Sequence, residues 1–211
     1  MKKLISIDIY SDTICPWCYI GQKKLQSAIE ECKERNFSTL WRPFQLNPDM
    51  PNEGMDRNLY LINKFGGKEQ ATRSYSYINK TGLENGIHFQ FDKIIKTPNS
   101  FASHKLLAIA HKFKKQNQII ESLFYSYFIE GLDIGDIDIL TKIAKQYKIH
   151  DRNTLNYLKS DEDKKSLLND ESQAKSLGVK GVPCFIINKE YVLFGAQDKN
   201  KFIEIFNKFD E

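Results

Sequence analysis

Residues 11–18 read Ser-Asp-Thr-Ile-Cys-Pro-Trp-Cys and stand where a strand-like pattern gives way to a helical one. Upstream, Ile5, Ile7 and Ile9 alternate with polar residues, which is the period-two pattern of a half-buried strand. Proline at position 16 suits the first turn of a helix, because its missing N–H has no intrahelical acceptor there. Downstream, apolar residues recur with the spacing of one helix face: Leu25, Ala28, Ile29 and Cys32. The stretch therefore predicts a strand followed by a helix that begins at the two cysteines.

Cys15 is thus expected at a helix N-terminus. Unpaired N–H groups and the positive end of the helix dipole stabilise a thiolate there, and a thiolate is the nucleophile of disulfide exchange. A Cys-x-x-Cys pair can also be half of a zinc site, but no second Cys or His pair stands at the usual short spacing. It can also be an inert structural disulfide, although so small a ring at a helix start favours a labile bond. We favour a redox-active pair, with no metal and no bound cofactor.

The composition is that of a globular protein and excludes fibrous and disordered classes. The chain has 211 residues, 41% of them hydrophobic and 27% charged, which is enough to bury a core without disulfides. Its net charge is only +4, and five of the 31 basic residues are arginine, on which specific nucleic-acid readers depend. We therefore predict no nucleic-acid partner.

The N-terminal Met1-Lys2-Lys3 is not expected to open a secretory signal. The apolar stretch that follows is only a few residues long and is interrupted by Asp8 and Asp12. No stretch approaches the roughly 18 apolar residues of a membrane span. The expected location is the cytoplasm, without a membrane partner, and in that reducing compartment a cysteine pair is more often catalytic or redox-sensing than structural.

Along the chain, the pattern changes from mixed to helical and back again. A second strand is expected over 37–46, and from residue 49 the pattern is helical for more than a hundred residues, with 86–96 as an ambiguous extended connection. A polar helix near 161–177, strands at 184–187 and 191–194, and a last helix capped by Asp198 complete the chain. The helices of the middle segment are expected near 59–65, 71–82, 98–110, 119–128 and 139–147. The predicted order is β-α-β, an all-helical insertion, then α-β-β-α.

This layout and its motifs resemble the thioredoxin superfamily, in particular the DsbA-type proteins with a helical insertion and, among them, the FrnE-like cytoplasmic branch. The resemblance covers nearly the whole chain and implies an α/β, thioredoxin-like fold. The thioredoxin-like domain would comprise residues 1–48 and 162–211, and the inserted helical domain residues 49–161. The motifs that carry the resemblance are Ser11 to Gly21, Phe44 to Met50, Asn99 with Ala102 and His104, Gly178 to Pro183, and Gly195-Ala196-Gln197.

The resemblance implies that the Val182–Pro183 peptide bond is cis and packs beside Cys15. The residue before such a proline can present its backbone to an extended substrate as a short strand partner. Pro16 and Trp17 would line the same substrate groove. His104 matches a family position but shares a helix face with apolar residues, so a structural histidine is favoured over a groove residue.

Two departures from the family pattern concern cysteines. FrnE-like proteins can carry a second cysteine pair toward the C-terminus, and this chain has none. The residue after Pro183 is Cys184, where an aromatic or aliphatic residue is more usual. A lone cysteine in an apolar run is expected to be a small core residue, with regulation as a lesser alternative.

Helix geometry orders the two thiols. Cys18 shares the inward stripe of its helix, whereas Cys15 stands at the expected exposed end, so Cys15 is predicted to attack and Cys18 to resolve. Cys32 lies too far along the helix to pair with Cys18. Asp12 is either a proton acceptor for the Cys18 thiol, as acidic groups under the redox pair are in thioredoxins, or a cap of the helix start.

The leading functional hypothesis is a thiol-disulfide oxidoreductase that acts on protein or small-molecule disulfides and dithiols, with glutathione as a candidate partner. One alternative is a glutathione-dependent enzyme of the kappa-class transferase and hydroxychromene-carboxylate isomerase type. Those relatives typically have Ser at the first active-site position and no resolving cysteine, so Cys15 together with Cys18 argues against them. A second alternative is a non-catalytic, redox-sensing module that binds peptides.

Overall fold

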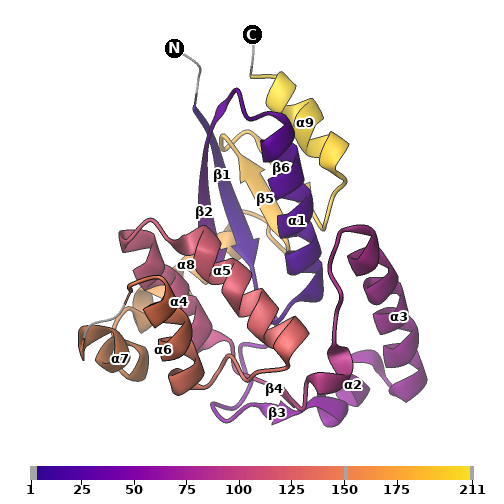
Figure 1. The fold of residues 1–211 in the computed structure, drawn as a ribbon, viewed down its shortest axis with the longest axis vertical. Coiled ribbons are helices and arrows are strands. Elements are labelled where there is room, and N and C mark those ends of the chain that lie inside the picture. Colours follow the sequence, from indigo (N-terminus) through magenta and orange to yellow (C-terminus); the bar gives the residue numbers. More distant parts are fainter. Residues whose placement is uncertain (1–3, 150–151, 210–211) are drawn as a thin grey trace.

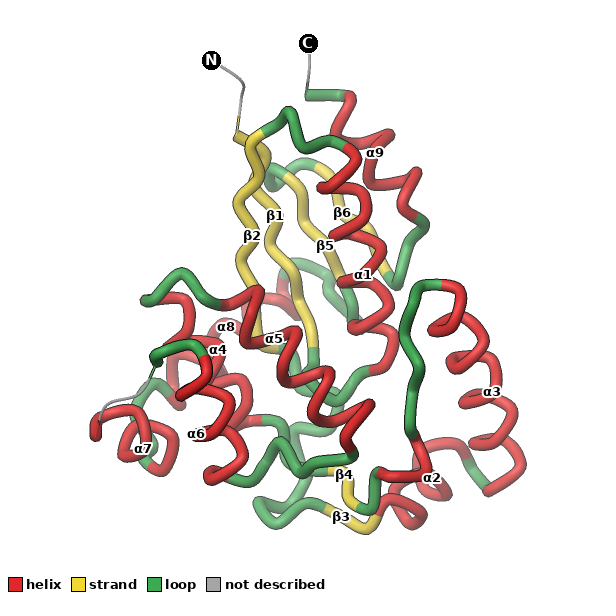
Figure 2. Tube along the Cα trace, in the orientation of Figure 1, coloured by secondary structure: helices red, strands yellow, loops and turns green. Residues whose placement is uncertain are grey.

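The computed structural model describes residues 4–149 and 152–209 of the chain. A sheet and two helices fill one half of the molecule, and the helices of the middle segment together with the helix at 164–176 fill the other (Figures 1 and 2). The strands are β1 (Leu4–Ser11), β2 (Asn36–Pro43), β3 (Met55–Asp56), β4 (Lys96–Thr97), β5 (Cys184–Ile187) and β6 (Tyr191–Phe194). The helices are α1 (Pro16–Glu31), α2 (Arg57–Phe65), α3 (Lys68–Glu84), α4 (Phe101–Lys112), α5 (Gln116–Tyr125), α6 (Ile137–Gln146), α7 (Arg152–Lys159), α8 (Lys164–Ser176) and α9 (Lys199–Asn207).

The main sheet has the strand order β2-β1-β5-β6. β1 and β2 are parallel over their whole length, as expected for strands joined by a crossover helix, whereas β5 and β6 form an antiparallel hairpin beside β1. The alternating isoleucines of β1 are all buried. α1 and α9 pack together against this sheet (Figure 1), and Phe202 and Phe206 of α9 are fully buried. This arrangement confirms the predicted α/β fold with a helical insertion.

Aromatic side chains join the middle segment to α1. Tyr19 of α1 stacks on Phe124 of α5, with ring centroids 5.0 Å apart, and lies edge-on to Phe89 at 6.0 Å. These rings belong to one hydrophobic core that continues from the sheet into the inserted helices. The predicted boundary near residue 49 therefore marks a change of pattern along the chain, and the division into two domains stays a prediction.

Three features were not expected from the sequence. Helix α7 carries few apolar residues. Its C-terminal end binds to α4 because the buried Lys105 ammonium of α4 donates to the carbonyl oxygens of Tyr157 and Ser160. β3 and β4 are two residues each, too short for a periodic signal. Asp198 does precede α9, but its side chain caps nothing and instead accepts from the Lys24 ammonium at 2.6 Å.

Candidate active site

The cysteine pair lies at the junction of β1 and α1, as predicted. Cys15 is the N-cap residue of α1 with an extended backbone (φ −95°, ψ 113°), and its carbonyl oxygen accepts from the N–H of Cys18 at 3.0 Å. Pro16 occupies the first turn. Both cysteines are free thiols. The end of α1 that carries them points toward the inserted helices (Figure 1).

The prediction of an exposed Cys15 is wrong, because only 4% of its surface is accessible and Cys18 is similarly buried at 1%. Residues from other parts of the chain cover this end of α1. The ring of Trp17 lies 5.7 Å from that of Tyr77 on α3, centroid to centroid, and the charge of Cys15 acts on the neighbouring Tyr75 hydroxyl. An inserted helix supplies this cover, and the spacing of residues along α1 alone does not predict it.

The Val182–Pro183 peptide bond is cis. The carbonyl oxygen of Val182 lies 3.9 Å from the Cys15 sulfur, close enough for the thiol to donate to it. The Pro183 ring packs against Gly21, where an added Cβ would lie 3.0 Å from the Pro183 Cγ and 3.1 Å from the Phe185 ring. The absence of a side chain at position 21 therefore lets Pro183 approach α1 one turn after Cys18.

The surroundings of the Cys18 thiol disfavour its ionised form. Burial raises the pKa of the Cys18 thiol well above its usual range, the neighbouring Cys15 adds to the rise, and the Ser11 hydroxyl and the Asp12 backbone oppose it. Cys18 therefore stays a thiol at neutral pH. A buried thiol that stays protonated suits the predicted resolving role of Cys18.

Asp12 is fully buried in the loop before Cys15. Its carboxylate accepts from the Leu46 N–H at 2.7 Å and, more weakly, from the Ile14 N–H at 3.3 Å. Helix α1 has no side-chain cap, so the capping alternative for Asp12 is wrong. Asp8, the other nearby acid, is paired with Arg42 at 2.9 Å and lines the sheet instead.

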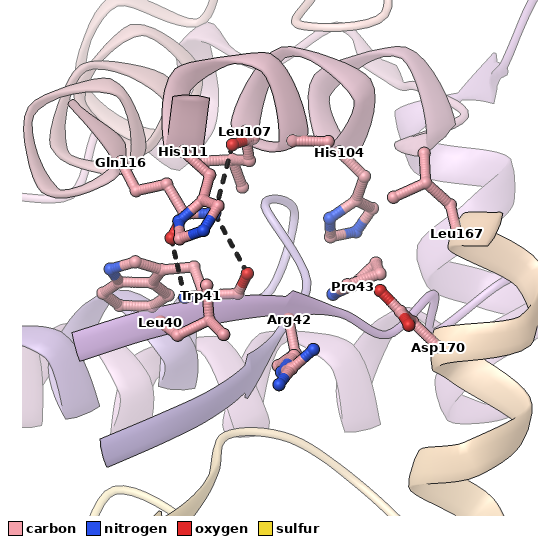
Figure 3. Close-up of a pocket in the computed structure, with 11 residues that line it drawn as sticks. Leu40, Trp41, Arg42, Pro43, His104, Leu107, His111, Gln116, Leu167 and Asp170 are labelled. Carbon is pink, nitrogen blue, oxygen red and sulfur yellow. Dashed lines mark hydrogen bonds between the residues drawn. The ribbon is translucent and has the colours of Figure 1, made fainter. Parts of the chain in front are cut away.

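His104 lies behind Asp12, on α4. Its Nε2 atom is 3.6 Å from an Asp12 carboxylate oxygen, and it has no hydrogen-bond partner although the side chain is 97% buried. His104 also lines a cavity of about 180 Å³ between α4, β2 and α8 (Figure 3). The structure thus places His104 between Asp12 and this cavity.

Motif residues far apart in the sequence meet around this loop. The Asn99 side chain donates to the Met50 carbonyl at 2.7 Å and accepts from Gln45 at 3.3 Å. The hydroxyls of Thr13 and Ser103 are 2.7 Å apart. The Thr13–Ser103 contact holds α4 to the segment that precedes Cys15, and the Asn99 contacts hold the start of α4 to the segment after β2.

The two remaining cysteines are buried, as expected. Cys32 lies at the C-terminal end of α1. Cys184 pairs with Tyr10 of β1 in the sheet and has no exposed surface, and burial raises its pKa to about 11. Cys184 therefore remains a thiol at neutral pH and packs as a small core residue.

Three residues of the inserted segment, which contact α1 or one another, were not predicted from the sequence. Tyr75 served only to mark a helix, and neither Tyr77 nor Arg57 carried a signal for the site. Arg57 is 95% buried, donates to the Tyr75 hydroxyl at 2.6 Å, and has no carboxylate partner among the residues that the structure describes. Burial raises the pKa of Tyr75, and Arg57 opposes that rise. Such residues are identified only by their tertiary contacts, because the spacing of residues in the sequence gives no sign of them.

Within residues 4–149 and 152–209, no group of three or more His, Cys, Asp or Glu side chains is arranged to hold a metal ion. In the same ranges, no helix is long and apolar enough to cross a membrane.

Comparison with known proteins identifies the family. Residues 6–206 match the model of the DsbA-like thioredoxin domain, and the chain therefore belongs to this family. The YwbO protein of Bacillus subtilis (strain 168) is 26% identical over 205 residues, which cover 94% of each chain. The FrnE-like branch within the family stays a prediction.

Two solved structures show the same fold. One is a probable DsbA oxidoreductase from Streptomyces coelicolor, with a TM-score of 0.88, 22% identity, and coverage of 97% of this chain and 89% of that one. The other is the cytosolic disulfide reductase DsbM from Pseudomonas aeruginosa with GSH, with a TM-score of 0.65, 13% identity, and coverage of 97% and 95%.

Alkylation of the reduced protein at neutral pH is expected to modify Cys15 first. Cys18 and Cys184 are held as thiols by their raised pKa values, whereas Cys15 stands at the unpaired N–H groups of α1. Timed iodoacetamide labelling followed by peptide mass spectrometry measures the order. Labelling of Cys18 should become faster only as the pH rises toward its raised pKa. Faster labelling of Cys18 or Cys32 at neutral pH would reverse the assignment.

Gly21→Val is expected to destabilise the fold and to disturb the groove. The new side chain would overlap the space held by the Pro183 and Phe185 rings, and overpacking of this kind costs about 1–3 kcal/mol. Urea denaturation measures the loss in the free energy of unfolding. Gly86→Val is the matched control for added bulk without overlap, although its positive φ of 73° adds backbone strain. A Gly21→Val protein as stable as wild type would contradict the close packing of Pro183 on α1.

Proposed function

We propose that the protein is a thiol-disulfide oxidoreductase that works through Cys15 and Cys18 beside a groove formed at Pro183. One observation carries the proposal: a free thiol at the N-terminus of α1 lies 3.9 Å from the carbonyl of the residue before a cis-proline. The family assignment supports disulfide chemistry in general, and the residue roles below are our inference.

In the direction of substrate reduction, the Cys15 thiolate attacks one sulfur of a substrate disulfide. A Cys15–substrate disulfide forms, and the other substrate sulfur leaves as a thiolate. Cys18 then attacks the Cys15 sulfur, so the Cys15–Cys18 disulfide forms and the second substrate sulfur leaves. The substrate gains two electrons and the enzyme dithiol loses them. Substrate oxidation is the reverse sequence.

The second step requires the proton of Cys18 to leave, because a buried thiol is a poor nucleophile. We assign this proton to the Asp12 carboxylate. The backbone of the same residue already lowers the Cys18 pKa through a hydrogen bond to the sulfur. The two acceptor contacts of Asp12 hold its carboxylate in one orientation. Asp12 thus has two roles: its hydrogen bonds hold the loop in place, and its carboxylate acts as the general base.

Substrate would lie along the backbone of Val182, with Pro16, Trp17 and Pro183 on either side. Trp17 is half-buried against Tyr77, so one part of its ring remains available to a substrate chain. Backbone pairing with Val182 suits an extended peptide, and it also suits glutathione, the ligand in the DsbM structure. His104 lies behind the loop and is a weaker candidate for substrate contact. We propose a cytoplasmic location, consistent with a cytosolic relative of the same fold.

The proposal is tested by a redox titration of the Cys15–Cys18 couple together with an insulin-reduction assay driven by dithiothreitol or glutathione. We expect a two-electron couple, and turnover that is lost in Cys15→Ser. A potential near about −270 mV favours reduction of substrates, whereas one near about −120 mV favours oxidation. A folded protein with no titratable couple and no turnover would instead support the non-catalytic sensing module. Glutathione-dependent isomerisation that survives Cys18→Ser would support the isomerase alternative.

A further inference from the structure

We infer that His104 relays the proton of Cys18 from Asp12 to solvent in the cavity behind the active site. The inference rests on the proposed function, because it concerns the same resolving step. His104 thereby takes a positioning and proton-transfer role, in place of the structural role that its apolar helix face favoured and of the alternative role in the substrate groove.

The need for a relay follows from burial. The Cys18 side chain and the Asp12 carboxylate have almost no exposed surface, so a proton that leaves Cys18 reaches Asp12 but not water. A buried carboxylate that cannot pass its proton on would return slowly to its ionised form after each turnover. One further group that reaches both Asp12 and solvent would remove this limit.

His104 meets both conditions. Its Nε2 atom faces the Asp12 carboxylate at 3.6 Å, and in the described part of the chain this atom has no other partner, so a small side-chain movement completes a hydrogen bond. An unpaired ring nitrogen at a 97% buried position costs free energy, and such groups are found at catalytic sites. The adjacent Ser103 holds α4 to Thr13, the residue after Asp12, which fixes His104 at this distance.

The His104 ring contacts Asp12 and also lines the cavity between α4, β2 and α8. Figure 3 shows His104 reaching from α4 toward Pro43 of β2, with Asp170 of α8 beyond it. The titratable and charged groups around this space are Asp12 from the loop, Arg42 from β2, His111 from α4 and Asp170 from α8, and Arg42 is held by Asp8. His111 is exposed at the rim, so the cavity opens to water there.

The relay moves one proton and no electrons. As Cys18 attacks the Cys15 sulfur, its proton passes to Asp12. Asp12 passes a proton to Nε2 of His104, and the resulting imidazolium releases one proton through its other ring nitrogen to water in the cavity. When the enzyme disulfide is reduced, the proton follows the opposite route.

The test follows the resolving step with dithiobis(nitrobenzoate) in the full-length, reduced protein. Attack by Cys15 releases one thionitrobenzoate and leaves the other on Cys15, and attack by Cys18 then releases the second. Stopped-flow absorbance separates the two phases. His104→Gln keeps a polar side chain at the site, His104→Ala enlarges the cavity enough to admit imidazole, and His111→Ala is a matched control in the same cavity wall.

We expect the second phase to slow by roughly tenfold or more in both His104 variants, with the first phase unchanged and His111→Ala equal to wild type. Imidazole should restore the second phase of His104→Ala in proportion to its concentration and should not affect His111→Ala. A second phase of normal rate in folded His104→Gln, or a loss that neither imidazole nor higher pH reverses, overturns the relay. If wild type releases the second thionitrobenzoate no faster than Cys18→Ser, the proposed function itself fails.

Discussion

Cys18→Ser is expected to accumulate a covalent mixed disulfide between Cys15 and substrate, and to lose at least about 99% of turnover. The intermediate forms normally because the helix-terminal thiol is intact, but the thiol that would release it is missing. Cys15→Ser is expected to trap almost nothing, because the buried Cys18 thiol stays protonated at neutral pH. Non-reducing electrophoresis and intact-mass measurement after incubation with oxidised insulin distinguish the two variants.

The matched control is Cys184→Ser, which changes a buried cysteine outside the proposed pair. Cys184 is fully buried in β5, so its replacement should leave turnover largely intact and lower mainly the free energy of unfolding, since a hydroxyl is placed in the core. If Cys184→Ser abolishes turnover as completely as Cys15→Ser, the two-cysteine mechanism is wrong and a three-thiol relay must replace it.

Asp12→Asn is expected to slow the attack of Cys18 by roughly 100-fold at neutral pH, with little change in the attack of Cys15. The amide can still accept from the Leu46 N–H through its oxygen, but it cannot take the Cys18 proton. Because the raised Cys18 pKa is then overcome only by solvent base, the defect should shrink as the pH rises. The second phase of thionitrobenzoate release, measured as a function of pH, provides the rate.

Asp8→Asn serves as the control for loss of a carboxylate near the sheet. Asp8 is paired with Arg42, so its replacement should lower stability slightly and leave the second phase unchanged. A normal rate of the second thionitrobenzoate release in folded Asp12→Asn would leave Asp12 only the structural role of binding the Leu46 N–H. A defect of equal size in Asp8→Asn would indicate a general effect of lost negative charge.

Local sequence determined the parts of the fold that depend on short-range spacing. The alternation of isoleucines fixed β1, the apolar stripe and Pro16 fixed the start of α1, and the run after Pro183 fixed the hairpin of β5 and β6. These patterns work because burial on one face of a single element repeats at that element's own period. The position of the redox pair followed from them directly.

The tertiary structure alone decided the surroundings of the pair. Tyr77 packs on Trp17 beside Cys15 only because α3 folds back onto α1, and Cys15 is buried there although helix geometry predicted an exposed position. Asp12 likewise meets His104 only because Thr13 and Ser103, ninety residues apart, hydrogen-bond across the insertion. Periodicity assigns a residue to a face of its own helix or strand. Packing between distant segments decides which partner lies against that face, and therefore the burial and the proton chemistry there.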